Sequence, residues 1–363
     1  MTTRHFLKFS IACLSFVFMG ASCISFNNSG SANSVSGDAG MFVSTDKGEN
    51  WQKISTAPTV NGIVDVSGVS VYRLVSDPQD PAALYWASRS AGLLFSYDKG
   101  KSWQRAAVPL NEGFIFGVVV HPTDKCTLYA TNGGFLYKTT DCSRSWTEVY
   151  REAKTDVKIT GVTIHNFAPY EIIAAQDNGT ILKSIDGGKS WQVTKRFKEK
   201  GLRHIISNPL QEGVIYAAFD KKGLAKSTDT GETWEFMNDG LEKFSKAKEF
   251  RRMSLHPFKA NVVYWISDYG ILLSEDGGVS WQEISLITSP GSAKIYGFAV
   301  NPNNDDELFY TATIENRSTL YKTVDGGTTW ITKRLPSGQI PTALYMEPEN
   351  ELLYLGFTIA PSQ

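Results

Sequence analysis

One short motif recurs along most of this chain and limits what it can fold into. The motif is S-x-D-x-G-x-x-W, and Ser184, Asp186, Gly188 and Trp191 form one complete copy. Seven copies or near-copies are present, and successive tryptophans lie 43 to 52 residues apart. A period of about 40–50 residues is typical of propellers and solenoids, in which one supersecondary unit is repeated. We therefore expect one repetitive domain.

The residue types of the motif suit a tight turn between two strands. An Asp carboxylate can accept backbone N–H bonds, and Gly takes the positive φ that such turns require. The preceding Ser or Thr can add a local hydrogen bond. The Trp falls on the returning strand, where it can bury about 200 Å² between sheets. We predict structural roles for Asp46, Asp98, Asp141, Asp186, Asp229, Asp276 and Asp325, and for Trp51, Trp103, Trp146, Trp191, Trp234, Trp281 and Trp330.

The motif resembles the Asp-box, or BNR, repeat of sialidases, xyloglucanases, sortilin-type receptors and the photosystem II stability/assembly factor-like group. This resemblance implies a β-propeller in which each box is a structural hairpin on the bottom side of a blade, away from the ligand face. The overall likeness is greatest to the photosystem II factor-like group and covers nearly the whole mature chain. Members of that group are exported, often lipidated, seven-bladed propellers with a basic patch on one face.

The segments between motifs read as four antiparallel strands per repeat, which is a propeller blade. Six complete repeats begin at Val71. The segment Gly40–Ile54 holds only a third and a fourth strand, whereas Ile340–Ile359 holds only a first and a second. Joined together, the two ends make one more blade and remove an exposed sheet edge. We predict an all-β, seven-bladed propeller over residues 40–363, closed by strands from both ends.

The N-terminus reads as an export signal over residues 1–22. Basic residues precede the apolar run Phe9–Met19, and Gly20–Ala21–Ser22–Cys23 then resembles a bacterial lipobox. The resemblance implies lipidation of Cys23. Plain cleavage near Ser22 is the alternative, because Gly20 stands where Leu or Val is usual.

Residues 23–39 are rich in Ser, Asn and Gly, as a flexible tether would be. We expect a monomeric membrane-anchored lipoprotein that faces the periplasm or the cell exterior, with a secreted soluble protein as the alternative. The formal net charge is only −1, which predicts no nucleic-acid partner.

Two cysteines fall in one repeat. Cys126 starts its second strand and Cys142 lies in its motif turn, where Ser143 replaces the usual Gly. In an exported protein this arrangement predicts a disulfide. Two unpaired thiols are the alternative.

One position near the start of the predicted first strands differs between repeats. Four repeats carry Gly or Ala there, as expected where blades crowd at the axis, but three carry Arg73, His204 and Arg252. Arg203 and Arg251 directly precede two of them. We predict that these five residues form a cationic, ligand-binding mouth on the top face, the face opposite the motif turns. A structural role is the alternative, with each Arg paired to a carboxylate or bonded to carbonyls at the channel edge.

Signals for catalysis are weak. Glycoside hydrolysis needs two carboxyl groups about 5–10 Å apart. Asp65, Glu112, Asp156 and Asp177 can lie on the top face, but no spacing pairs any two of them. The resemblance to xyloglucanases implies two propellers that face each other with a carboxylate pair between them, and this chain has one propeller.

These observations favour a non-catalytic scaffold with no catalytic residues. It would act in binding or assembly at the cell envelope, with an envelope or extracellular protein or glycan as its ligand. A glycan-active hydrolase of the sialidase or xyloglucanase sort is the alternative. The five histidines are scattered and no metal-ligand cluster is seen, so we expect no metal and no cofactor.

Overall fold

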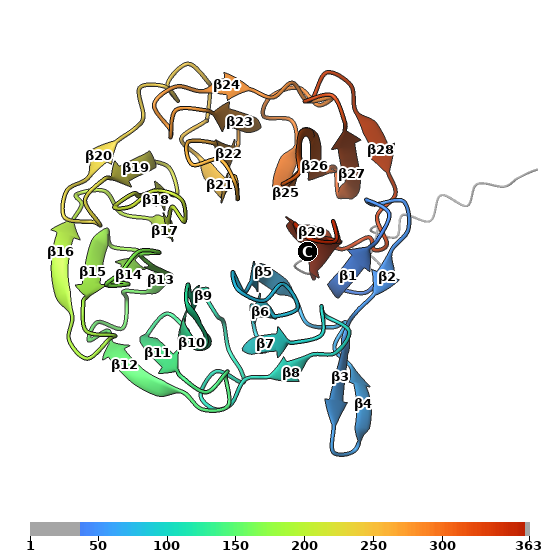
Figure 1. Ribbon diagram of the computed structural model, residues 1–363. Coiled ribbons are helices and arrows are strands. Elements are labelled where there is room, and N and C mark those ends of the chain that lie inside the picture. The colour runs from blue at the N-terminus through green and yellow to red at the C-terminus, as the bar shows by residue number, and fades with distance from the viewer. Residues whose placement is uncertain (1–36, 360–363) are drawn as a thin grey trace, which may run out of the picture. The chain divides into compact units, whose positions relative to one another are not determined.

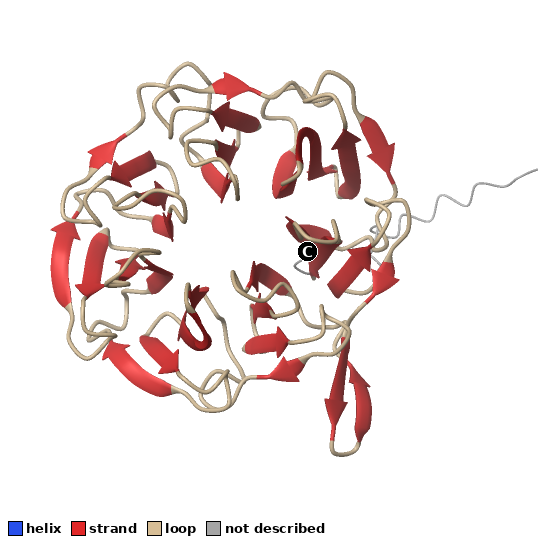
Figure 2. Cartoon of the chain, viewed as in Figure 1, coloured by secondary structure: helices blue, strands red, loops and turns tan. Residues whose placement is uncertain are grey.

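Seven four-stranded antiparallel sheets form a closed ring, and a two-stranded hairpin projects from it (Figure 1). The computed structural model describes residues 37–359. Strands and connecting loops account for this whole part of the chain, and Figure 2 shows no helix in it. No segment of residues 37–359 is therefore a helix that could span a membrane. The predicted seven-bladed all-β propeller is confirmed. The predicted signal over residues 1–22, the lipidated Cys23 and most of the tether lie outside the described residues.

Each blade begins at the axis and ends at the rim of the ring. The first strands of blades 1 to 7 are β5 (Val71–Ser76), β9 (Gly117–His121), β13 (Ile159–Ile164), β17 (Leu202–Ser207), β21 (Phe250–Leu255), β25 (Lys294–Asn301) and β29 (Ile340–Met346). The second strands are β6 (Leu84–Ser88), β10 (Asp124–Thr131), β14 (Ile172–Gln176), β18 (Ile215–Phe219), β22 (Val263–Ser267), β26 (Asn304–Ile314) and β30 (Leu353–Thr358).

In the outer half of each blade the third strand is largely buried, whereas the fourth strand at the rim is mostly exposed. The third strands are β7 (Leu93–Ser96), β11 (Phe135–Thr139), β15 (Thr180–Ser184), β19 (Gly223–Ser227), β23 (Ile271–Ser274), β27 (Arg317–Thr323) and, in blade 7, β1 (Gly40–Ser44). The fourth strands are β8 (Gln104–Arg105), β12 (Thr147–Arg151), β16 (Gln192–Arg196), β20 (Glu235–Phe236), β24 (Gln282–Glu283), β28 (Ile331–Lys333) and β2 (Gln52–Lys53).

The core lies between the blades. Strands such as β6 and β14 are buried along their whole length, which explains why they lack an alternating polar pattern. Each apolar cluster joins neighbouring blades: Tyr85 and Phe95 of blade 1, for example, share a cluster with Val118 and Leu128 of blade 2. The ring is therefore held by a series of sheet-on-sheet contacts and has no single centre.

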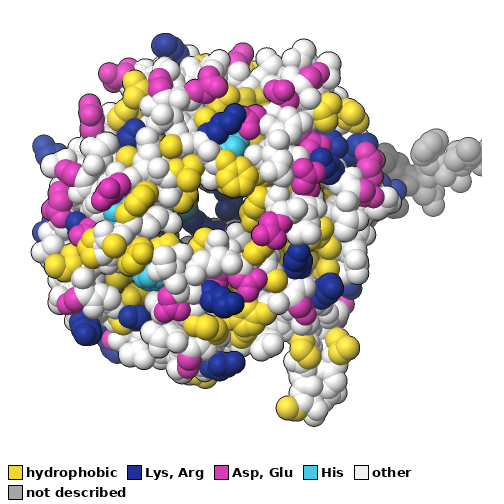
Figure 3. Space-filling view, viewed as in Figure 1, with side chains coloured by type: hydrophobic (Ala, Val, Ile, Leu, Met, Phe, Trp, Pro, Cys, Tyr) yellow, Lys and Arg dark blue, Asp and Glu magenta, His cyan; other side chains and the backbone are white. Residues whose placement is uncertain are grey.

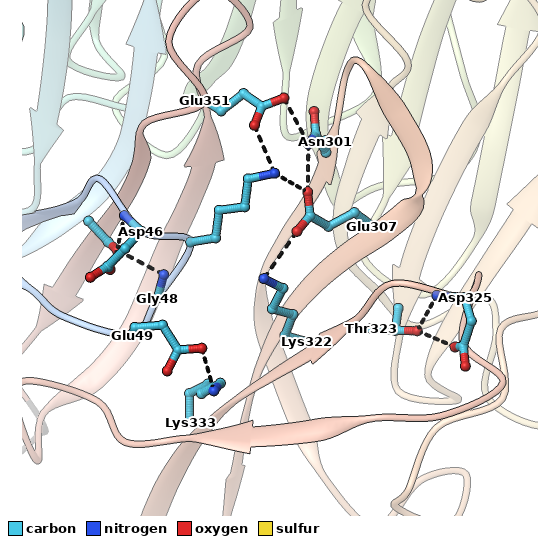
Figure 4. A network of polar contacts seen from close by, with 12 residues as sticks. Asp46, Gly48, Glu49, Asn301, Glu307, Lys322, Thr323, Asp325, Lys333 and Glu351 are labelled. Atoms are coloured by element: carbon cyan, nitrogen blue, oxygen red, sulfur yellow. Dashed lines mark hydrogen bonds and ion pairs between the residues drawn. The ribbon is translucent and has the colours of Figure 1, made fainter.

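Blade 7 closes the ring with strands from both ends of the described chain, in the order β2-β1-β30-β29, as predicted. The five residues of β1 pair with β30, from Gly40 opposite Phe357 to Ser44 opposite Leu353. A polar network secures the join between blades 6 and 7 (Figure 4). Lys47 Nζ lies 2.8 Å from Glu307 Oε2 in β26 and 2.7 Å from Glu351 Oε2, which follows β29.

The motif turns join third to fourth strands and define the bottom face. In blade 3, the Ser184 hydroxyl donates to Asp186 Oδ1 at 2.9 Å and accepts the Gly188 N–H at 2.8 Å. Asp186 also accepts the backbone N–H and the hydroxyl of Ser190, at 2.9 and 2.6 Å. Gly188 has a φ of 94°, and a Cβ there would lie 3.1 Å from Val149 of the preceding blade. Gly is thus required for both conformation and space.

Three motif tryptophans, Trp103, Trp191 and Trp330, donate their indole N–H to a backbone carbonyl of the preceding blade. Trp103 is fully buried, and its indole N–H donates to the carbonyl of Ile54 at 2.6 Å. Trp191 makes the same kind of bond to Val149 at 2.8 Å. These hydrogen bonds give the tryptophans that make them a structural role at the junction between two blades.

The turn of blade 2 departs from the others in one respect. Cys142 and Ser143 have φ values of 57° and 68°, so two residues with side chains occupy the left-handed region. Cys126 and Cys142 are joined in a disulfide, with their Cα atoms 4.0 Å apart. A covalent bond therefore spans the one motif turn that lacks its glycine.

The hairpin of β3 (Thr56–Thr59) and β4 (Gly62–Asp65) was not expected from the sequence. It projects outward between blades 7 and 1 (Figure 1). Thr59 and Gly62 are paired across a two-residue tip, and Val60 and Ile63 are largely exposed. Asn61–Gly62 is a strong hairpin signal that could have predicted it.

Candidate functional site

The top end of the axial channel is built by a repeated irregularity in the first strands. In six blades the pairing of first and second strands shifts by one residue near the start of the first strand. Such a bulge re-aims the side chain that follows it. In blades 1, 4 and 5 the residues after the shift are Arg73, His204 and Arg252, the three predicted from the sequence.

Small residues occupy the same position elsewhere, because the neighbouring blade is close. A Cβ on Gly161 would lie 3.1 Å from Ile205, and one on Gly297 would lie 3.0 Å from Leu344. The long side chains of the other blades escape this crowding by reaching into the channel.

Arg73 and His204 meet across the axis. Arg73 NH1 lies 2.5 Å from His204 Nδ1, although their blades are three apart around the ring. A guanidinium only donates, so His204 Nδ1 is the acceptor and the imidazole is neutral at that nitrogen. Burial, followed by the charges of Arg73 and Arg252, holds the pKa of His204 well below its usual value.

Arg252 also spans the channel. It donates to the backbone carbonyls of Tyr296 at 3.1 Å and Tyr72 at 3.0 Å, and to that of Thr342. These acceptors belong to blades 6, 1 and 7. Burial, then the nearby Arg73, lowers the pKa of Arg252 to about 10. The structure thus brings Arg73, His204 and Arg252 together as one group, called here the channel cluster.

Arg203 and Arg251 precede two members of the channel cluster but are held by carboxylates. Arg203 NH2 lies 3.3 Å from Asp220 Oδ2, and Arg251 Nε contacts Asp268 Oδ1. Arg251 also lies over the ring of Tyr296, with 5.2 Å from its guanidinium carbon to the ring centroid. The five predicted residues therefore divide into three at the axis and two in ion pairs beside it.

Three top-face aspartates share one structural position that sequence reasoning did not single out. Asp177, Asp220 and Asp268 each follow a second strand, in blades 3, 4 and 5. Each donates its backbone N–H to the residue before the first strand of its own blade. Their recurrence after the second strand was the signal available in the sequence. Among the ion pairs of residues 37–359, Asp220 and Asp268 each have an arginine, whereas Asp177 has none. Asp177 Oδ1 instead accepts the Lys158 N–H at 3.0 Å.

The other carboxylates suggested from sequence do not join Asp177. Asp65 lies on the projecting hairpin, where hydrogen bonds from Lys53 and Ser67 lower its pKa to about 2. Glu112 and Asp156 are exposed loop residues. The structure therefore leaves Asp177 as the remaining candidate of that set on this face.

An aromatic cluster lies at the top of blades 1 and 2. The rings of Tyr72 and Phe114 meet edge to face at 4.8 Å, and Phe114 stacks on Phe116 at 4.1 Å. The guanidinium of Arg89 lies 5.2 Å from the Tyr72 centroid. Burial acts to raise the pKa of Tyr72, but Arg73 and Arg252 outweigh it and the pKa is lowered. Partly exposed aromatic faces with a few polar groups are typical of ligand-binding surfaces.

The two best-formed hollows lie away from this site. A cavity of about 430 Å³ lies between the motif turns of blades 2 and 3, lined by residues that include Lys138, Glu148 and Lys189. A second, of about 90 Å³, lies beside Tyr269, whose hydroxyl donates to Glu283 and whose pKa is thereby raised to about 12. Among residues 37–359 no group of three or more His, Cys, Asp or Glu side chains is placed to hold a metal.

Comparison with known proteins gives two kinds of match. No family model matches the chain. A xyloglucanase of Hypocrea jecorina is 23% identical over 296 residues, which cover 71% of this chain and 30% of that protein. A Paenibacillus xyloglucanase is 24% identical over 279 residues, or 69% of this chain and 24% of that protein. The chain thus spans about a third or less of the length of these relatives.

Solved structures show the same fold in two settings. The GH74 xyloglucanase from Xanthomonas campestris superimposes with a TM-score of 0.63 at 14% identity, over 85% of this chain and 52% of that one. The structure of YCF48 bound to D1 peptide gives 0.58 at 17% identity, over 80% of this chain and 94% of that one. The chain is therefore a propeller similar to both.

These relatives correct one expectation. The sequence favoured a non-catalytic binding or assembly scaffold, but the curated relatives are named as xyloglucanases and the fold is shared with GH74 enzymes. The main expectation was wrong, and the glycan-active hydrolase, given as the alternative, is the better supported. The error arose because a lone propeller without a carboxylate pair was taken to lack catalysis.

Proposed function

We propose that this chain is a glycan-active hydrolase of the xyloglucanase sort, whose top face forms one wall of a cleft for a β-glucan. The observation that carries the proposal is the extent of the similarity. It covers 69–71% of this chain in the two xyloglucanases described above, and so exceeds any single repeat. A likeness limited to the motif turns would support only the fold.

Asp177 is the carboxylate that this wall contributes. An acid, base or nucleophile must be free to exchange a proton or form a bond, and a carboxylate neutralised by arginine is a poor candidate for that work. Asp177 stands at the same position as Asp220 but lacks its arginine. The second carboxyl group of the pair would come from a second propeller facing this one.

The aromatic cluster of Tyr72, Phe114 and Phe116 is the sugar-binding part of the wall. Its rings present apolar faces beside the charged Arg89, an arrangement that can bury the face of a sugar ring and orient its hydroxyls. The predicted export, lipidation of Cys23 and surface anchoring suit a protein that meets extracellular polysaccharide. They remain predictions.

The test measures binding and hydrolysis of xyloglucan separately. Binding is measured as retardation in a native gel that contains xyloglucan, and hydrolysis as release of reducing ends. We expect Phe114→Ala to weaken retardation, and Asp177→Asn to lower hydrolysis by about 100-fold or more while leaving retardation unchanged. Asp220→Asn is the matched control and should keep most activity.

Each failure has a distinct meaning. Retardation without hydrolysis, by the protein alone and with a partner propeller supplied, refutes the hydrolase and leaves a glycan-binding domain. Absence of both, on xyloglucan and on other β-glucans, refutes the whole proposal. Equal loss in the Asp177 and Asp220 variants would remove the role given to Asp177.

A further inference from the structure

We propose that the axial channel binds a small oxyanion, a carboxylate or a phosphate, between the guanidinium groups of Arg73 and Arg252. The inference is independent of the hydrolytic function proposed above. Its starting observation is an imbalance of charge. Two arginines reach across the axis from blades 1 and 5, and neither has a carboxylate within ion-pair distance among residues 37–359.

The neighbours of these arginines satisfy hydrogen bonds but do not neutralise charge. Arg252 is bonded to three backbone carbonyls, and Arg73 to His204 and to the carbonyl of Arg203 at 3.3 Å. His204 accepts a bond and is neutral, so it offsets nothing. Arg73 and Arg252 are half-buried, and a cation that is partly removed from water with only dipoles around it remains costly. A second cation beside it adds repulsion.

One donor of the cluster is left over. Arg73 Nε is buried and has no hydrogen-bond partner among the described residues. Buried polar atoms without a partner are rare and need an explanation such as an ion or ligand. An oxyanion that bridges the guanidiniums would satisfy this N–H and the excess charge together.

The neighbouring arginines show that the imbalance is specific to the axis. Arg251 directly precedes Arg252 in β21, Arg203 directly precedes His204 in β17, and each of these two neighbours has an aspartate. The chain thus supplies anions for the arginines beside the channel but not for those within it. A further positive charge is nearby, because the Arg89 guanidinium also lowers the pKa of Arg252.

The centre of the ring is open in the space-filling view (Figure 3). Figure 3 shows a hollow at the centre of the ring with Lys or Arg side chains inside it. A guanidinium presents parallel N–H groups that match the two oxygens of a carboxylate or phosphate. The fit is to a single oxyanion group, which could be free phosphate or the carboxylate of an acidic sugar.

The experiment is isothermal titration calorimetry of the protein with three probes. Sodium glucuronate and inorganic phosphate test the two sources of the oxyanion, and glucose is the neutral counterpart of glucuronate. We expect at least one anion to bind and glucose not to bind. Arg73→Gln should weaken that binding by about tenfold or more, and Arg73→Lys by less, because a charge remains. Lys198→Gln, which changes an exposed loop lysine, is the charge-matched control and should bind like the unaltered protein.

Arg252→Gln provides a second variant if Arg73→Gln fails to fold, and thermal unfolding checks both. If phosphate binds and glucuronate does not, the site is assigned to a free inorganic ion. If glucuronate binds, the site is assigned to a ligand that carries a carboxylate. The proposal is overturned if no anion binds to the unaltered protein, or if anions bind equally to the Arg73, Arg252 and Lys198 variants.

Discussion

The bottom and top faces of this ring use the same residue type in opposite ways. On the bottom face, Asp98 accepts the Ser96 hydroxyl at 2.7 Å and the Ser102 hydroxyl at 2.6 Å, within one turn of chain. On the top face, Asp177 accepts one backbone N–H, from Lys158. A carboxylate that accepts several hydrogen bonds from its own motif has a structural role. A carboxylate that accepts only one hydrogen bond from the chain is available for chemistry.

The arginines show the same contrast within a single face. Arg203 and Arg251 are paired to aspartates, whereas Arg73 and Arg252 are bonded only to neutral acceptors. Residues that recur from blade to blade thus belong to the scaffold. Residues that depart from the repeat form the candidate site. Changes to the scaffold should therefore alter stability, and changes to the top face should alter binding or catalysis.

The largest effect is expected from removing the end of blade 7. Deletion of the residues after Glu347 removes β30, the strand that pairs with both β29 and β1. We expect loss of the cooperative thermal transition followed by circular dichroism, because the ring can no longer close. Shortening the projecting hairpin at its exposed tip is the control and should leave the transition in place. A truncated protein with an unchanged melting profile would contradict the closure shown here.

The next largest effect is expected at the disulfide of blade 2. Replacing Cys126 and Cys142 by Ser opens a loop whose ends are 16 residues apart. Loop-closure entropy predicts a loss of about 3 kcal/mol in the free energy of unfolding. Urea denaturation of the double variant, beside the reduced parent protein, measures it. A loss below about 0.5 kcal/mol would show that the bond adds little to this turn.

A smaller effect separates the two kinds of aspartate directly. Asp98→Ala removes hydrogen bonds to Ser96 and Ser102 and should lower stability by about 1–2 kcal/mol. Asp177→Ala should change stability by less than about 0.5 kcal/mol. Paired urea denaturation curves give both values. Equal losses would show that Asp177 is as structural as the motif aspartates, and the contrast between faces would fail.

The most gradual effect is expected in acid. Hydrogen bonds lower the pKa of Asp46, Asp141, Asp276 and Asp325 to about 2 from an ordinary 3.8, and in Asp46 the backbone N–H of Asn50 is the main cause. A lowered pKa in the folded state gives stability that is present above the unfolded value and is lost as protons bind below it. We expect urea midpoints to hold steady above about pH 5 and to fall from about pH 4 towards pH 2. A fall that begins near neutral pH would implicate other groups.

Much of the scaffold could be predicted because its determinants are local. Asp186, Gly188 and Trp191 lie within one turn and its returning strand, so their spacing alone reveals the hairpin. The composite blade followed from counting strands at the two ends. The projecting hairpin was missed although Asn61–Gly62 signals it, because the repeat pattern assigned no strands to that segment.

The site could be predicted only in part because its geometry is not local. The alignment indicated that Arg73, His204 and Arg252 share a position near the axis. It could not show that Arg73 crosses the ring to His204, since that contact depends on the bulges and on the channel width. Nor could it show which arginines pair with aspartates, because Asp220 and Asp268 lie 17 residues further along the chain, after the second strands of their blades. The wrong functional expectation had the same origin, since the absence of a local carboxylate pair does not show whether a second propeller completes one.

The closure of blade 7 also sets the order in which the molecule can be completed. As the chain emerges from the ribosome or from an export channel, β1 and β2 come early, and their partner β30 comes last. Until then, β1 offers an unpaired edge to any other strand in its vicinity. Pairing of such distant segments makes folding slow. We therefore expect wrong strand pairing to be most favoured while β30 is not yet available to β1.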